Sequence, residues 1–109
     1  MKVLEKAKER TLLLSFSGEM DHHGVQNILQ QIDMAIDAAL PKMLTLDFSK
    51  VTFMDSSGIA LILHSQQKMQ LLKGNMILSN VPQQAKRVLN AAGINQVIRI
   101  RNQPCCFDN

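Results

Sequence analysis

The sequence has no tryptophan, no tyrosine and only four phenylalanines among its 109 residues. Proteins that bind single-stranded nucleic acids stack the bases on aromatic side chains, and such platforms are scarce here. The net charge is only +3, from 12 basic and 9 acidic residues, although residues 86–101 carry two lysine or arginine pairs and no acid. We therefore expect no direct contact with nucleic acid.

Long apolar runs are also missing. None approaches the roughly 18 residues that a membrane span requires. The charged N-terminus, MKVLEKAKER, lacks the apolar stretch of a secretory signal. The two cysteines, Cys105 and Cys106, are adjacent and near the end, where they close no useful loop and complete no four-ligand zinc site. We expect a cytoplasmic protein with no membrane span and no metal.

The length and the 46% hydrophobic content suit a single domain over residues 1–109. Alternating apolar residues predict a strand over 11–17, with 2–8 as its partner in an edge hairpin. Apolar residues with a period of 3.6 predict a helix from Val25 to Leu40, which Pro41 ends. The remaining pattern predicts strands at 43–48, 76–78 and 97–100, helices at 57–72 and 81–92, and a turn region over 49–55. The order predicts an α/β fold, with a mostly parallel mixed sheet and helices in right-handed crossovers. Residues 102–109 are predicted to be irregular.

The methionines and the start of the second helix bear on where a partner could bind. Five of the seven methionines fall at or beside positions expected to be buried, so they are predicted to pack in the core: Met34, Met43, Met54, Met69 and Met76. Residues 59–63 are apolar all round the predicted helix. One face must pack on the sheet, so part of the remainder is a candidate partner surface.

Two polar loops, residues 18–23 and 52–58, follow predicted strands and open helices, where ligands of such sheets usually bind. The second contains D-S-S-G, Asp55 to Gly58. Helix N-termini stabilise anions, so a phosphoryl group on Ser56 or Ser57 would be favoured by backbone N–H groups and opposed by nearby carboxylates. The alternative is that Asp and Ser simply cap a helix, as they commonly do.

Three segments carry a family resemblance: GEMDHH at 18–23, DFSKVTFMDSSGIALIL at 47–63 and GNMILSNVPQQAKRVLNAAGINQVIRI at 74–100. Over residues 8–101 the chain strongly resembles the STAS domain of bacterial anti-sigma factor antagonists, especially the type that controls the sporulation sigma factor F. Many members of that family have a further helix after the last strand. Here Pro104 and the lack of an apolar stripe predict that this helix is missing.

The resemblance implies a regulatory protein that is not an enzyme. Its unphosphorylated form would bind an anti-sigma factor that is also an ATP-dependent serine kinase, and thereby release the sigma factor. Ser57 corresponds to the serine that the kinase phosphorylates, and Asp55 and Ser56 are its neighbours. Asp21 and His22 correspond to partner-binding residues, and Gly58 would let the partner and its nucleotide approach closely. A serine phosphatase would restore the binding form. The chain itself would need no cofactor, because the kinase binds the ATP.

Other functions stay open at this point. Ser57 with His22 or His23 and Asp21 or Asp55 could be a hydrolase triad, but the glycines of a nucleophile elbow are absent. His22 and His23 are consecutive, so their side chains diverge by about 100° at a helix start and do not easily share a metal. His64 is predicted to be packed or partly exposed. A STAS module that acts as a scaffold, or that binds a small ligand or nucleotide without switching, is the main alternative.

Overall fold

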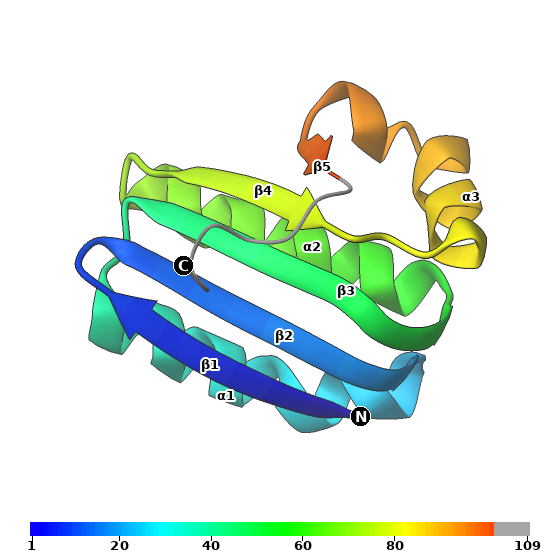
Figure 1. The fold of residues 1–109 in the computed structure, drawn as a ribbon, viewed down its shortest axis with the longest axis horizontal. Coiled ribbons are helices and arrows are strands. Elements are labelled where there is room, and N and C mark those ends of the chain that lie inside the picture. The colour runs from blue at the N-terminus through cyan, green and yellow to red at the C-terminus, as the bar shows by residue number, and fades with distance from the viewer. Residues whose placement is uncertain (102–109) are drawn as a thin grey trace.

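The computed structural model describes residues 1–101 and shows a five-stranded sheet with strand order β1-β2-β3-β4-β5 (Figure 1). β1 pairs with β2 in an antiparallel hairpin, and the other neighbouring strands are parallel. The predicted α/β class, element order and edge hairpin are therefore confirmed. The elements are β1 (Lys2–Lys8), β2 (Thr11–Met20), α1 (His22–Ala39), β3 (Met43–Met54), α2 (Ser56–Leu71), β4 (Asn75–Ser79), α3 (Gln83–Ala91), the 3-10 helix η1 (Ile94–Gln96) and β5 (Arg99–Arg101).

The strand order decides where the helices lie. Each parallel strand is added on the same side of the preceding one, so right-handed crossovers place their helices on one face of the sheet. Figure 1 shows α1 and α2 side by side behind the sheet, with α3 displaced toward the end of β3. The carboxyl ends of β2 and β3 therefore open into the N-termini of α1 and α2 at the same edge.

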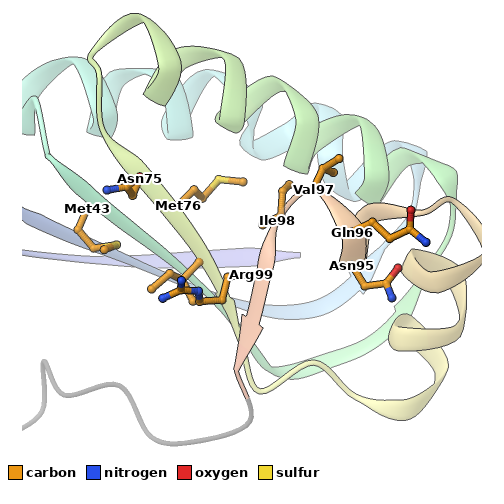
Figure 2. Close-up of a pocket in the computed structure, with 9 residues that line it drawn as sticks. Met43, Asn75, Met76, Asn95, Gln96, Val97, Ile98 and Arg99 are labelled. Carbon is orange, nitrogen blue, oxygen red and sulfur yellow. The ribbon is translucent and has the colours of Figure 1, made fainter.

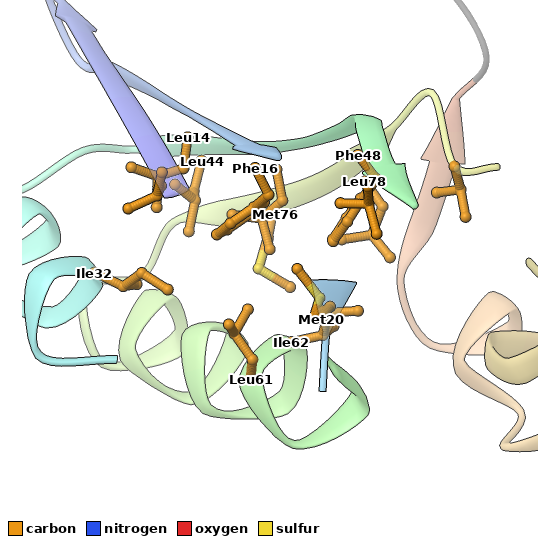
Figure 3. Close-up of a cluster of buried hydrophobic side chains, with 14 of the residues drawn as sticks. Leu14, Phe16, Met20, Ile32, Leu44, Phe48, Leu61, Ile62, Met76 and Leu78 are labelled. Atoms are coloured by element: carbon orange, nitrogen blue, oxygen red, sulfur yellow. The ribbon is translucent and has the colours of Figure 1, made fainter. Parts of the chain in front are cut away.

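The core lies between this face and the two long helices. Figure 3 shows Phe16, Phe48 and Leu78 of the sheet projecting toward Leu61 and Ile62 of α2. The rings of Phe16 and Phe48 stack with centroids 5.4 Å apart. All five of these residues are fully buried. Burial of a large apolar side chain contributes about 1.5–3 kcal/mol, so this cluster holds α2 firmly against the sheet.

Some sequence-based boundaries need correction. β3 continues through Met54, although residues 49–55 were predicted to be a turn. The last strand begins only at Arg99 rather than at Val97, because the N–H groups of Val97 and Ile98 donate to the Ile94 carbonyl at the end of η1. Met34 was expected in the core but is 64% exposed, and Met43 is half-buried, whereas Met54, Met69 and Met76 are buried as predicted. The predictions for residues 102–109 lie outside the described residues.

Among the described residues, no helix has both the length and the apolar character needed to cross a membrane.

Candidate functional site

The N-termini of α1 and α2 lie side by side at the carboxyl ends of the parallel strands. Met20 at the end of β2 pairs with Met54 at the end of β3, and Asp21 and Asp55 follow directly. The Asp55 N–H donates to the carbonyl oxygen of Met20 at 3.4 Å, which links the two segments. The structure thus brings the two predicted polar segments together, but they are not loops. Residues 18–20 belong to β2 and residues 52–54 to β3, and α1 begins at His22 rather than Val25, so a single aspartate separates strand from helix in each segment.

Both α1 and α2 begin with an aspartate cap. The Asp21 carboxylate accepts a hydrogen bond from the Gly24 N–H at 2.9 Å, and the Asp55 carboxylate accepts one from the Ser57 N–H at 2.8 Å. Such caps satisfy backbone donors that the first helical turn leaves free. The capping interpretation of Asp55 is therefore correct, and it does not remove the two serines from consideration. Ser56 and Ser57 stand in the first turn of α2, and Ser56 is exposed while Ser57 is half-buried.

Gly58 is explained by packing inside the molecule. It is buried, and a Cβ atom at this position would lie 2.6 Å from Met54 Cγ and 3.1 Å from Met20 Sδ. The family resemblance assigned Gly58 to the partner-contacting surface. In the structure its missing side chain lets the start of α2 approach the ends of β2 and β3, and the predicted contact of Gly58 with a partner stays a prediction. The packing of Gly58 against the core therefore fixes the backbone position of the neighbouring Ser57.

A residue that the sequence analysis missed completes this edge. β4 pairs with β3 only from Met43 to Asp47, so the end of β3 has no β4 partner. The Gln84 side chain of α3 replaces it: the Met54 N–H donates to Gln84 Oε1 at 2.9 Å, and Gln84 Nε2 donates to the Met54 carbonyl at 3.0 Å. The amide of Gln84 thus pairs with the backbone of β3 immediately before the Asp55 cap.

A sequence repeat could have indicated that the two segments are built alike. Met20-Asp21-His22-His23-Gly24 and Met54-Asp55-Ser56-Ser57-Gly58 share the pattern Met-Asp-x-x-Gly. In both segments the Met ends a strand, the Asp caps a helix and the Gly is buried. The variable pairs, two histidines and two serines, occupy equivalent places at the two helix starts. His22 and His23 are both exposed, with ring centroids 6.1 Å apart.

A partly apolar surface adjoins the serines. Leu61 and Ile62 of the apolar stretch are buried, whereas Ala60 is exposed and Leu63 is 42% exposed. Ser56, Ala60 and Leu63 are spaced i, i+4 and i+7, which places them on one face of α2. Phe53, at the end of β3, is 40% exposed. This face, together with Asp21, His22 and Asp55, forms the surface we call the switch face.

The geometry gives no support to a hydrolase. Within residues 1–101, the Ser57 hydroxyl has no histidine partner, and His64 Nε2 lies 2.7 Å from an oxygen of Asp33. His64 is partly exposed, as predicted, and lies beside an ion-pair cluster that Lys68 forms with Asp33 and Asp37 between α1 and α2. Lys68 lies 2.8 Å from Asp37 in this cluster, and their hydrogen bond raises the pKa of the Lys68 ammonium. No cluster of three or more metal-binding side chains occurs in the part of the chain that the structure describes.

Comparisons with known proteins agree on the family to which this chain is similar. The STAS domain family matches residues 3–104. The anti-sigma F factor antagonist of Lysinibacillus sphaericus is 30% identical over 91 residues, which span 84% of this chain and 78% of that protein. The one from Paenibacillus polymyxa is 30% identical over 89 residues, 82% of this chain and 76% of that protein.

Solved structures of one antagonist are also similar. The unphosphorylated form of SpoIIAA, an anti-sigma factor antagonist, superposes with a TM-score of 0.79 at 26% identity, covering 91% of this chain and 87% of that one. The phosphorylated form of the Bacillus cell fate determinant SpoIIAA superposes with a TM-score of 0.71 at 26% identity, covering 91% of this chain and 90% of that one. The five-stranded mixed sheet with its three helices is therefore the same fold as that of SpoIIAA.

Proposed function

The chain belongs to the STAS domain family, and from this premise we propose that it is an anti-sigma factor antagonist switched by phosphorylation of Ser57. In the unmodified state its switch face binds an anti-sigma factor and releases the sigma factor that the anti-sigma factor holds. Phosphorylation of Ser57 weakens this complex. A serine phosphatase restores the binding form. Sigma factors act on RNA polymerase, so the protein works in the cytoplasm.

The observation that carries the proposal is the place of Ser57. It stands in the first turn of α2, half-buried, two residues after the Asp55 cap and beside the exposed Ser56 of the switch face. A kinase can reach this turn because Ser56 beside it is exposed. Gly58 packs against Met54 on the core side, which fixes the backbone of the turn that contains Ser57.

The electrostatics of the turn explain why phosphate would weaken binding. A phosphoserine carries about 1.5 to 2 negative charges at neutral pH. The Ser57 N–H, which could otherwise stabilise the phosphate, already donates to Asp55 at 2.8 Å. For a separation of about 6 Å, charges of −2 and −1 repel by about 1.4 kcal/mol in water and about 5.5 kcal/mol at the dielectric of a protein surface. Docking of a partner removes water from the phosphate and lowers the local dielectric constant. The repulsion between the phosphate and the carboxylate therefore rises toward the larger of these two energies.

The neighbouring residues then have distinct roles. Asp21 and Asp55 cap the two helices and provide the carboxylates that oppose a phosphate. Ser56 and His22 are exposed polar groups that a partner contacts beside Ser57. Ser57 needs no general base of its own, because in phosphoryl transfer the kinase supplies the metal ions and orients the hydroxyl. The chain is accordingly a substrate and a competitor, and the partner kinase is the enzyme that uses ATP.

Phosphate mapping tests the acceptor. The protein is incubated with its cognate anti-sigma factor and ATP, and the modified residue is located by mass spectrometry. We expect a single phosphate on Ser57 and none in the Ser57→Ala variant. Modification of Ser56 alone, or of no residue, would refute the assignment of the acceptor.

Binding measurements test the switch. Ser57→Asp should weaken binding to the anti-sigma factor about tenfold or more, since it places a charge in the interface. Ser57→Ala should bind nearly as tightly as the unmodified chain but escape inactivation by the kinase. The control is Gln30→Glu, which adds one negative charge on an exposed position of α1 outside the switch face. Equal affinities for the Asp and Ala variants would point to a STAS scaffold that does not switch.

A further inference from the structure

A groove lies at the end of the sheet opposite the switch face. Its cavity of about 550 Å³ runs between the start of β4 and the segment that joins η1 to β5 (Figure 2). A second cavity of about 300 Å³ continues it toward α2, and the two share Asn75, Met76, Val97, Ile98 and Arg99. We call this the β4–β5 groove. It lies near Met43, where β3 begins, and Ser57 follows the other end of that strand.

The groove exposes the edge of a strand. β5 pairs with β4 only at Ile77, Leu78 and Ser79. On this side, the start of β4, Asn75–Met76, therefore faces the groove with no strand beside it among the described residues. An exposed strand edge is a place where an extended peptide can add main-chain hydrogen bonds.

The lining combines apolar groups, amides and one cation. Val97 is 63% exposed and offers an apolar contact beside Met76. The carboxamides of Asn75, Asn95 and Gln96 provide hydrogen-bond donors and acceptors. Arg99 is exposed, and no carboxylate is among the described residues that line either cavity. The groove thus favours an occupant with both apolar and negatively charged groups.

Three more cations, Arg10, Lys42 and Lys73, lie in the connections at this end of the sheet, outside the lining of the two cavities. The Lys42 N–H donates to the Arg10 carbonyl at 2.7 Å, and the Asn75 N–H donates to the Lys42 carbonyl at 2.8 Å. The Lys42 ammonium also donates to the Leu72 carbonyl at 3.3 Å, which holds it beside Lys73. These hydrogen bonds hold the β1–β2, α1–β3 and α2–β4 connections next to one another at this end of the sheet. Within those three described connections, Glu9 is the single acid.

We propose that the β4–β5 groove binds an acidic, extended segment of a partner protein. Apolar side chains of the segment would contact Val97 and Met76, and its carboxylates would face Arg99. Nucleic acid suits the groove less well, because no aromatic side chain lines it for base stacking. An anionic membrane also suits it less well, because the apolar residues line a recess rather than a protruding anchor. The surface is separate from the switch face, so it can be occupied whatever the state of Ser57.

A peptide titration followed by NMR tests this inference. The probe is a fluorescent eight-residue peptide of alternating glutamate and valine, and the matched control peptide has glutamine in place of each glutamate. We expect shifts of the backbone amides of Asn75, Met76, Val97 and Arg99, and binding that weakens as salt is added. Equal binding of the two peptides, or shifts confined to residues 52–58, would overturn the inference.

Charge variants sharpen the test. Arg99→Gln should weaken binding of the acidic peptide at least threefold at low salt, with an unchanged melting temperature. Arg87→Gln is the control, since Arg87 is an exposed cation on α3 that does not line the groove. If Arg87→Gln loses as much affinity, the effect comes from the net charge of the protein and not from the groove. That result would contradict the proposed binding site. Tighter binding of a DNA duplex or of phosphatidylserine vesicles at these same residues would also contradict it.

Discussion

Replacing Gly58 with alanine tests whether packing beneath the serine turn fixes its position. A Cβ atom at Gly58 would lie 2.6 Å from Met54 Cγ, far inside van der Waals contact. Met54 Cγ is close to the backbone of β3, and the side chain is fully buried, so it has little room to move away. The substitution should therefore displace the first turn of α2.

Two effects of opposite sign set the magnitude. Overpacking of a tight core costs about 1–3 kcal/mol, and the short distance places this site toward the upper end. Alanine in place of a helical glycine gains up to about 1 kcal/mol. We expect the free energy of unfolding to fall by about 1–2 kcal/mol, which lowers the melting temperature by roughly 5–10 °C.

Urea unfolding of the wild type, Gly58→Ala, Met54→Ala and the double variant measures the coupling. Met54→Ala removes the Cγ atom, so in that background Gly58→Ala should become neutral or stabilising. The reasoning is refuted if Gly58→Ala stabilises the wild-type protein, as it would at an exposed helical position. It is also refuted if Gly58→Ala has the same effect in both backgrounds.

Three further predictions concern contacts around the site and the α1–α2 interface. Asp55→Ala should lower the free energy of unfolding by about 1 kcal/mol because the Ser57 N–H loses its cap, and Asp55→Asn should restore most of it; urea titration would count against the cap if both variants matched the wild type. Gln84→Leu should cost about 1–3 kcal/mol and speed amide exchange of Met54, because two hydrogen bonds to the end of β3 are lost; unchanged exchange would contradict this role. Lys68→Met should lose at most about 1 kcal/mol at pH 7, since Asp37 is largely exposed. The pKa of Lys68 is raised by its hydrogen bond to Asp37, so this contribution is fully present below the ordinary pKa of 10.5 and disappears as the pH rises through the folded value. A difference between the variant and the wild type that persists at still higher pH would disagree with that sign.

The sequence was sufficient for the architecture. The helical period from Val25 to Leu40 reflects burial on one face, as the structure shows. Leu12, Leu14 and Phe16 are buried as their alternation predicts, although Leu13 on the opposite face of β2 is buried as well. The length of β3 could not be predicted in the same way. Its last residues, from Ser49 on, mix polar and apolar side chains, and their extended conformation depends on pairing with the end of β2 and on Gln84.

The sequence predicts which residues form the candidate site, but it does not predict the distant residues that hold them in place. Asp55 and Ser57 are local neighbours in a capping motif, so the sequence alone indicates a helix start. The closeness of Asp21 to this turn follows from parallel pairing once the strand order is known. Gln84 and the inward role of Gly58 depend on contacts between distant residues, for which one sequence contains no local pattern.

Displacement of the sigma factor is the most direct test of the proposed function. A preformed complex of the cognate anti-sigma factor with its labelled sigma factor is titrated with the unmodified chain or with the chain phosphorylated on Ser57, and free sigma factor is measured. The unmodified chain should release the sigma factor, and the phosphorylated chain should require about a hundredfold higher concentration, which corresponds to about 3 kcal/mol of lost binding. Equal release by the two forms, or no release by either, would contradict the account.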